Sequence, residues 1–230
     1  MIHRAFHPES TLSTRRLEAY TDGVFAIAAT LLVLDLTGRT FGRIDSDAQL
    51  WEAIAGLASP VFTFVLSFAL LSLMWVTHVS QFEYIARVDA VAVWINNVRL
   101  LFVVLVPFTS TLLTDYSDWL AGRMLLPLNF FLVISCSWLQ WGWAARRREV
   151  TMPGLSADDA RRWGRGALSA VLIAASVVAL APWIGSIAFL LFALDGPLTK
   201  LLGGGSMTHM EPTAESTADS TAERDAPQQD

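Results

Sequence analysis

The chain has 230 residues, of which 53% are hydrophobic and only 16% are charged, and its mean hydropathy is +0.46. Soluble domains usually have about 25% charged residues, so this composition excludes an ordinary soluble domain. The formal net charge of −5 equals that of residues 203–230, which hold six acids and one arginine, so residues 1–202 are neutral overall.

The composition divides the chain into three parts. Residues 1–15 are polar and are expected to form a cytoplasmic N-terminal segment. Residues 16–202 contain the apolar stretches and are expected to form a single transmembrane domain. Residues 203–230 are rich in Ser, Thr, Ala, Pro and acids, a composition that cannot bury enough apolar surface to fold, so we expect a disordered acidic tail.

Six stretches approach the length of about 20 apolar residues that a helix needs to cross the hydrocarbon core. They are Leu17–Leu36, Ile54–His78, Val91–Leu113, Leu120–Ala145, Ala167–Ala181 and Ile184–Leu202. The last two are short and are separated by a Pro-Trp pair, which indicates a tight helical hairpin. The predicted fold class is therefore all-α, a polytopic membrane protein with six transmembrane helices.

The distribution of arginine orients these helices. Short cytoplasmic loops carry an excess of Lys and Arg. With the N-terminus inside, the inner segments hold ten arginines and the outer loops hold three. We therefore expect a multi-pass protein of the cell membrane with both termini in the cytoplasm.

Four polar residues fall at a similar depth near the predicted cytoplasmic face: Asp22, His78, Asn96 and Arg99. Ionisable groups inside membrane helices are costly and mark a functional site or a paired structural one. They could clamp three helices together, or they could contact an ion or sense pH, because a histidine near a carboxylate can titrate in the physiological range. The sequence leaves both readings open.

Helical geometry separates Asp22 from an apolar stripe on the first helix. At about 100° per residue, Leu31 and Leu34 lie within about 40° of Ile27, whereas Asp22 lies about 140° away. Thr30 flanks the stripe at about 60°. Such a stripe is typical of ordinary helix packing, and a hydrophobic constriction that gates by dewetting would look the same.

Three motifs resemble the endosomal/lysosomal transmembrane potassium channel family in its bacterial six-helix branch. The first-helix signature of that family is Arg, three residues, then Phe-Ser-Asp, and this chain has Arg16 followed by Tyr20-Thr21-Asp22. The second helix ends with Trp75-x-x-His78, similar to the Trp-x-x-His of the family. The third contains Trp94-Ile95-Asn96 and, further on, Pro107-Phe108, similar to a Trp-Leu-Asn and Pro-Phe pair.

The resemblance implies a potassium-favouring cation channel in the lipid bilayer, assembled as a homotetramer around a pore lined by the first helix. It implies a hydrophobic gate of three apolar residues, Ile27, Leu31 and Leu34, and a selectivity role for the hydroxyl of Thr30. It also implies a supporting polar network of Arg16, Asp22, Trp75, His78 and Asn96. Arg99 stands where the family usually has an apolar residue, so it could pair with Asp22 or with Asp89 and alter that network.

An alternative function is a proton-coupled transporter that uses Asp22 and His78 as a relay. An enzyme is not expected, because His78 is the only histidine within the predicted membrane region and no nucleophile–base spacing accompanies it. No cofactor, metal or nucleic-acid partner is expected either.

Overall fold

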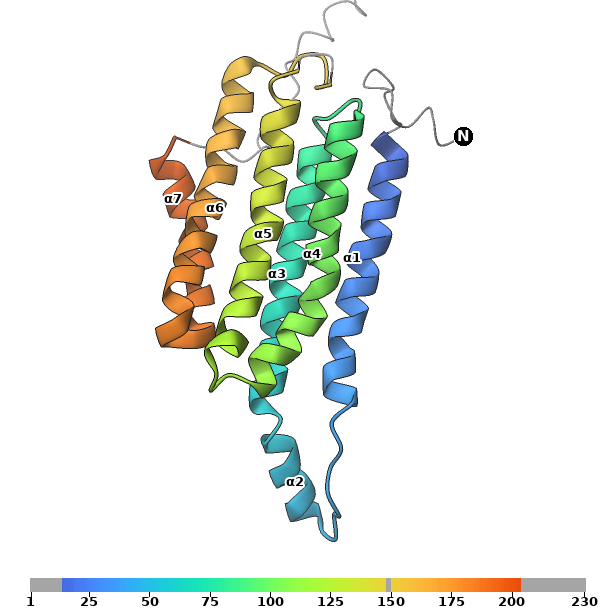
Figure 1. Ribbon diagram of the computed structural model, residues 1–230, viewed down its shortest axis with the longest axis vertical. Helices are drawn as coiled ribbons and strands as arrows, with labels where there is room; N and C mark the ends of the chain where they lie inside the picture. Colours follow the sequence, from blue (N-terminus) through green and yellow to red (C-terminus); the bar gives the residue numbers. More distant parts are fainter. Residues whose placement is uncertain (1–13, 148–149, 204–230) are drawn as a thin grey trace, which may run out of the picture.

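The computed structural model describes residues 14–147 and 150–203, and the predicted acidic tail lies outside this part of the chain. The described residues form a helical bundle (Figure 1). Its elements are α1 (Thr14–Thr37), α2 (Asp47–Ala55), α3 (Ala58–Phe82), α4 (Ala90–Asp115), α5 (Leu120–Ala144), α6 (Ala157–Ile184), the 3-10 helix η2 (Gly185–Leu194) and α7 (Asp195–Leu201). No regular strand occurs in these residues, which confirms the all-α prediction.

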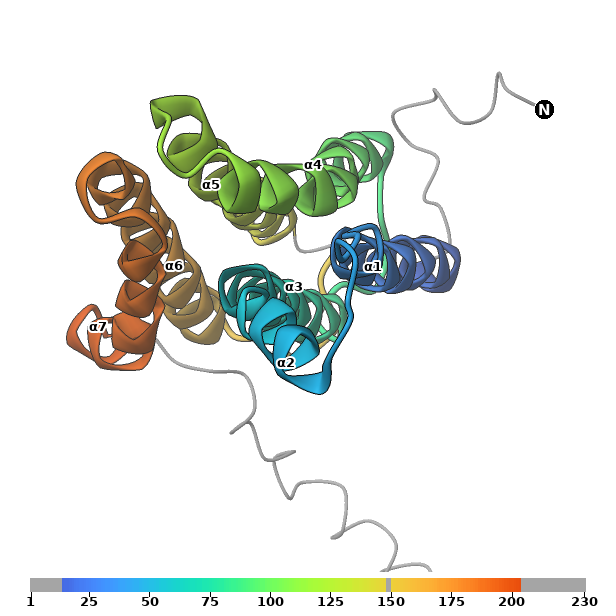
Figure 2. The same ribbon diagram turned by 90° about the horizontal axis from the view of Figure 1, so that it is seen from below.

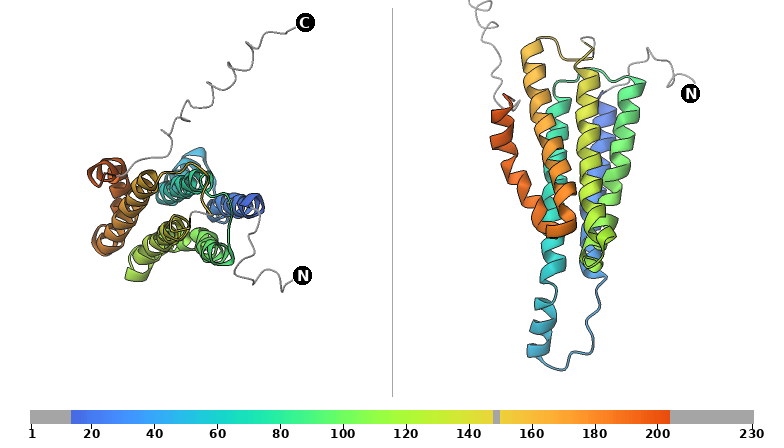
Figure 3. Two further views of the ribbon diagram at one scale, coloured as in Figure 1. Left: turned by 90° about the horizontal axis from the view of Figure 1, so that it is seen from above. Right: turned by 60° about the vertical axis from the view of Figure 1, so that its left-hand side comes forward.

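Among the described residues, five stretches are long and apolar enough to cross a membrane. They are α1, α3, α4, α5 and the continuous stretch Ala157–Leu201, which contains α6, η2 and α7. The last stretch doubles back, so that α7 lies alongside α6 (Figure 3). The chain is a multi-pass membrane protein, as the sequence predicted.

The helical hairpin at the end of the domain differs from its predicted boundaries. α6 begins at Ala157, ten residues before the predicted start, because Ser156 caps it by accepting a hydrogen bond from the amide of Asp159 at 3.0 Å. Its first three turns carry Asp158, Asp159 and three arginines, and this polarity hides the helical start from a search for apolar stretches. The return arm is a 3-10 helix that continues into the short α7, rather than one α-helix.

The second predicted helix, Ile54–His78, corresponds to α3, and the short helix α2 that precedes α3 was not predicted. α2 is a separate short helix with no buried residue, and it extends beyond the end of the bundle (Figure 1). Ser46 caps α2 by accepting from the amide of Gln49 at 3.3 Å. The membrane helix α3 starts only at Ala58, with Pro60 in its first turn, where proline is tolerated.

α4 occupies the centre of the contacts that hold the bundle together. It packs against α5 on one side and against α1 and α3 on the other, while α6 packs beyond α5 (Figure 2). The main core cluster joins Phe25 and Leu32 of α1, Leu71 of α3, and Val103 and Val106 of α4. α1 and α6 therefore lie at opposite ends of the molecule (Figure 2).

Candidate functional site

The helix α1 has one face turned into the bundle and one face turned away from it. The buried face consists of Leu17, Thr21, Phe25, Ala28 and Leu32. On the other face Ile27, Leu31 and Leu34 are 60%, 38% and 57% exposed. The apolar stripe therefore does not pack into the core of its own chain, and it stays available for a neighbouring molecule.

Thr30 is exposed on α1 close to this stripe. Its hydroxyl donates a hydrogen bond to the carbonyl oxygen of Ile27 at 2.8 Å, one turn earlier on the same helix. A threonine hydroxyl donates one hydrogen bond and can accept others. Because the hydroxyl proton is donated to the backbone, the Thr30 oxygen has its lone pairs free to interact with a cation.

A buried polar network joins α1, α3 and α4 in the half of the bundle that was predicted to face the cytoplasm. Asn96 of α4 donates to the hydroxyl of Thr21 at 2.9 Å and accepts a hydrogen bond from Arg99 at 2.6 Å. The same Nη2 atom of Arg99 lies 2.7 Å from Nδ1 of His78 on α3. All four side chains are at most 1% exposed. The network therefore clamps three helices together.

The contact with Arg99 determines the protonation pattern of His78. An arginine guanidinium only donates hydrogen bonds, so Nδ1 of His78 must accept and the ring proton must sit on Nε2. The imidazole lies between Phe25 and Phe82, at ring-centroid distances of 6.2 and 4.3 Å. A second proton on His78 would break its bond to Arg99 and place two buried cations side by side.

Asp22 belongs to a different cluster. Its carboxylate accepts a hydrogen bond from the indole nitrogen of Trp75 on α3 at 2.9 Å. The two residues line a groove of about 370 Å³ between α1 and α3, whose other lining residues are Phe25, Ala26, Ala29, Leu71 and Ser72. Asp22 is exposed in the single chain and lies outside the buried network of His78 and Asn96, with which its predicted depth had grouped it.

The five residues that the resemblance places in one supporting network thus fall into separate groups. His78 and Asn96 share the buried network, Asp22 and Trp75 form the exposed pair, and Arg16 lies exposed in the first turn of α1. Asp22 and His78 have different partners. Within residues 14–147 and 150–203, no three His, Cys, Asp or Glu side chains gather as a metal site would require.

Arg99 pairs neither with Asp22 nor with Asp89 in this structure. Its hydrogen bonds go to His78 and Asn96. Asp89 instead caps α4 by accepting from the amide of Ala92 at 2.8 Å, and it forms an ion pair with Arg147 at 2.9 Å. Arg99 is therefore a buried cation held by neutral partners, and an arrangement of this kind is costly unless its hydrogen bonds are well made.

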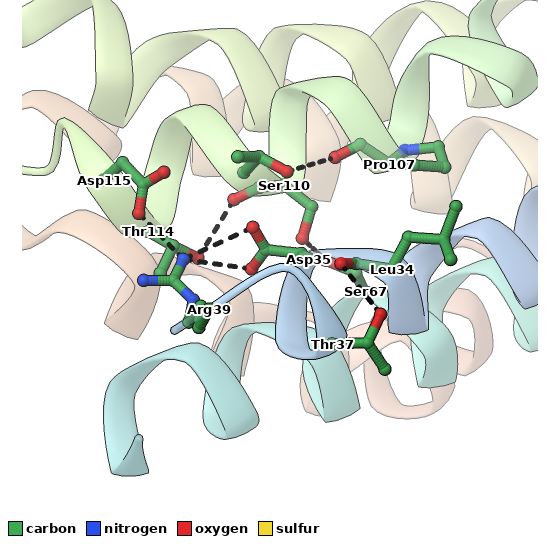
Figure 4. Close-up of polar contacts among 10 residues, drawn as sticks. Leu34, Asp35, Thr37, Arg39, Ser67, Pro107, Ser110, Thr114 and Asp115 are labelled. Atoms are coloured by element: carbon green, nitrogen blue, oxygen red, sulfur yellow. Dashed lines mark hydrogen bonds and ion pairs between the residues drawn. The ribbon is translucent and has the colours of Figure 1, made fainter. Parts of the chain in front are cut away.

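A second polar clamp holds the predicted outer end of α1. Arg39, just after α1, lies between Asp35 of α1 and Asp115 at the end of α4, with contacts of 3.1 and 2.7 Å (Figure 4). The hydrogen bond to Asp115, aided by Asp35, raises the pKa of Arg39 above its ordinary value. Below this clamp the hydroxyls of Ser67 and Ser110 lie 2.9 Å apart and join α3 to α4.

Sequence reasoning missed Thr21 and the Arg39 clamp. Thr21 is adjacent to Asp22, yet it is fully buried, because one residue of offset turns a side chain by about 100°. The spacing of the buried residues of α1 could have revealed it, since Leu17, Thr21 and Phe25 recur every four residues. Asp35 and Arg39 have the same spacing of four, which is typical of an ion pair on a helix.

The comparisons with known proteins match these residues to a family. Residues 16–107, which run from α1 into α4, match the family described as endosomal/lysosomal potassium channel TMEM175. The matched range contains the apolar stripe, the buried network and the Asp22–Trp75 pair. The resemblance indicated by the three motifs is confirmed.

Two bacterial relatives carry the name potassium channel. One, from Streptomyces collinus, is 39% identical over 101 residues, which are 44% of this chain and 48% of the relative. Another, from Chamaesiphon minutus, is 38% identical over 115 residues, which are 47% of this chain and 53% of the relative. The chain thus spans about half the length of these relatives.

Two further similarities extend the comparison. The human endosomal/lysosomal proton channel TMEM175 is 30% identical over 104 residues, 43% of this chain and 21% of the human protein. The crystal structure of a lysosomal potassium-selective channel TMEM175 homolog from Chamaesiphon minutus superposes with a TM-score of 0.62 at 25% identity. That superposition covers 82% of this chain and 95% of the homolog, so the similarity of fold reaches well beyond α4.

Proposed function

Because residues 16–107 belong to the endosomal/lysosomal potassium channel TMEM175 family, we propose that this chain is a subunit of a passive cation channel that favours potassium. Several copies are required, since one helix cannot enclose a pore, and closed cyclic symmetry is the usual arrangement of such copies. We propose a homotetramer in the cell membrane with both termini in the cytoplasm. The central pore is then lined by α1 of each subunit.

The observation that carries this proposal is the exposed apolar stripe of α1. Ile27, Leu31 and Leu34 project from the helix that contains the family signature, outside its buried face. Lipid alone would also cover an apolar stripe, so the family membership of α1 is what favours a pore over a lipid contact. Around a symmetry axis, each of these positions would form one apolar ring.

The proposed mechanism follows from the chemistry of such rings. A narrow apolar constriction holds water poorly, so ions pass only while it is wetted. Thr30 lies between Ile27 and Leu31 and offers hydroxyl oxygen to a partly dehydrated cation at this level. The buried network of Thr21, Asn96, Arg99 and His78 would hold the inner half of α1 in place.

The alternative of a proton relay through Asp22 and His78 has less support. Asp22 is bound by Trp75 and His78 by Arg99, so the two residues belong to separate clusters. A relay would also require His78 to become a cation next to Arg99. The buried network therefore supports a structural role for His78.

The test is the replacement Ile27→Asn, compared with Val33→Asn, in planar bilayers. Val33 is also exposed on α1, but it lies outside the stripe, about 120° from Ile27. Ile27→Asn should raise single-channel conductance, because it replaces an apolar ring with a wettable one. Val33→Asn should leave conductance close to that of the parent, and equal currents from the parent and both variants would overturn the pore assignment.

A further inference from the structure

A groove of about 510 Å³ lies between α5 and α6, near the end of the bundle that holds the loop from α5 to α6. Its lining includes Trp138, Leu139 and Arg146 of α5 and the turn after it, and Arg161, Arg165 and Leu168 of α6. Three of these residues are arginines and the others are apolar. With the orientation proposed above, the groove is at the cytoplasmic surface of the membrane.

The floor of the groove is fixed by contacts between the two helices. The indole nitrogen of Trp141 donates to the carbonyl oxygen of Ala160 at 3.1 Å, and its ring lies 4.3 Å from that of Trp163. A methyl group at Gly164 would lie 3.6 Å from the Trp141 nitrogen, which is an ordinary contact distance, so this face of α6 lies directly against the indole. The groove is therefore part of the folded helix pair and needs no rearrangement to form.

The wall residues combine positive charge with apolar surface. Arg146 and Arg165 have no ion pair among the described residues, although Arg165 donates a hydrogen bond to the carbonyl oxygen of Gly203 at 3.4 Å. Arg161 is paired with Asp158 on the exposed surface. Asp158 offsets one of the three charges, so the groove remains positive. Trp138 and Leu139 extend the lining along α5 toward the apolar middle of the helix.

We propose that this groove binds the phosphate group of an anionic glycerophospholipid, with the acyl chains along the apolar face of α5 and α6. Basic pockets between membrane helices on the cytoplasmic side suit anionic headgroups. Arginine donates several hydrogen bonds to phosphate oxygens in a fixed geometry. A soluble phosphate would use the arginines alone, whereas a lipid would also cover Trp138, Leu139 and Leu168, and this is why the lining favours a lipid.

The position of the groove in the bundle is compatible with contact to lipid. α6 is at the opposite end of the molecule from α1 (Figure 2). If α1 lines the central axis, as the proposed function has it, α5 and α6 face outward in the assembly. This step rests on the proposed function, but binding of lipid to the groove can be measured without any ion current.

The test is native mass spectrometry of the full-length protein titrated with phosphatidylglycerol, phosphatidylcholine or inorganic phosphate. The groove variant is Arg146→Gln with Arg165→Gln. The control is Arg87→Gln with Arg162→Gln, which removes the same charge from exposed arginines on the same side that do not line the groove. We expect the parent and the control to retain phosphatidylglycerol in preference to phosphatidylcholine. The groove variant should bind it roughly thirtyfold more weakly, since each of the two basic residues contributes about 1 kcal/mol.

Three results would overturn the proposal. Equal phosphatidylglycerol binding by the groove and control variants would mean that general surface charge retains the lipid. Competition by inorganic phosphate at the concentration of the lipid would mean that the arginines recognise a free anion. A third variant, in which the six acids of residues 203–230 become amides, should bind phosphatidylglycerol like the parent. Much tighter binding by this variant would mean that the acidic tail, rather than a lipid, occupies the groove in the parent.

Discussion

Arg99 donates a hydrogen bond from Nη2 to Nδ1 of His78 at 2.7 Å, and this contact makes the histidine a neutral acceptor in the middle of the bundle. The same nitrogen reaches Asn96, which in turn binds Thr21 on α1. A buried cation is thus surrounded by neutral groups that belong to three helices. Its hydrogen bonds determine how α1 sits against α3 and α4.

Replacing Asn96 with alanine should destabilise the protein strongly. The change removes the acceptor for Arg99 and the donor to Thr21 together, and a lost buried hydrogen bond to a charged group costs about 1.5–3 kcal/mol. The neighbouring Asn97→Ala is the matched control, because Asn97 is only half-buried and has no hydrogen bond among the contacts described here. Unfolding of the detergent-solubilised protein by SDS measures the stability of both variants. Equal losses of stability would contradict the role of Asn96 in holding the three helices together.

The contribution of the Arg39 clamp to the stability of the protein should depend on Asp115 and on ionic strength. The Arg39–Asp115 pair is half-buried, so Asp115→Asn should lower the free energy of unfolding by about 1 kcal/mol, less at high salt. Asp45→Asn is the control, since its pair with Arg43 is much more exposed than the Arg39–Asp115 pair. Thermal unfolding at low and high salt tests this, and an equal effect of the two variants would mean that the pair does not act as a clamp.

The turn between α4 and α5 should not tolerate a methyl group at Gly122. A Cβ atom there would overlap the carbonyl oxygen of Tyr116, so the backbone would have to move. We expect Gly122→Ala to cost about 1–3 kcal/mol, the range for overpacked sites. Gly142→Ala in the same helix meets open space and should be neutral or stabilising by up to about 1 kcal/mol. The thermal unfolding midpoints of the two variants measure this difference. A Gly122→Ala protein as stable as the parent would show that the turn can shift freely.

Thr30→Val should change ion selectivity without unfolding the protein. Valine keeps the shape of threonine but removes the hydroxyl, so the permeability ratio of potassium to sodium should fall. The control Thr77→Val removes a hydroxyl that bonds the carbonyl of Leu73 on α3, away from the stripe. Reversal potentials under bi-ionic conditions measure the ratio, and an unchanged ratio for Thr30→Val would remove Thr30 from the selectivity proposal.

The sequence alone predicted the membrane helices and the apolar stripe, because both depend on local composition and on helical periodicity. It also predicted that His78, Asn96 and Arg99 lie at one depth. It did not predict which of them would touch, since a hydrogen bond depends on how each helix is rotated and crossed. Asp22 is one residue from Thr21, yet the rotation of α1 buries Thr21 with Asn96 and leaves Asp22 with Trp75.

The starts of α3 and α6 could not be predicted from hydropathy alone. Hydropathy measures the apolar part of a helix, whereas capping determines where the helix starts. α6 begins with a polar segment capped by Ser156, and the residues before α3 form the separate helix α2. Both features are signalled by short polar motifs outside the apolar stretches.

The attachment of α1 at several levels has a mechanical consequence. Thr14 donates to the carbonyl oxygen of Ala86 at 2.8 Å, Thr21 binds Asn96, and Arg39 after the far end binds Asp115. A rod held at both ends cannot swing about one of them as a lever would. Under the proposed pore assignment, a change in pore width would therefore require α1 to bow at its centre, near Ile27 and Leu31, or would require each subunit to turn as a rigid body.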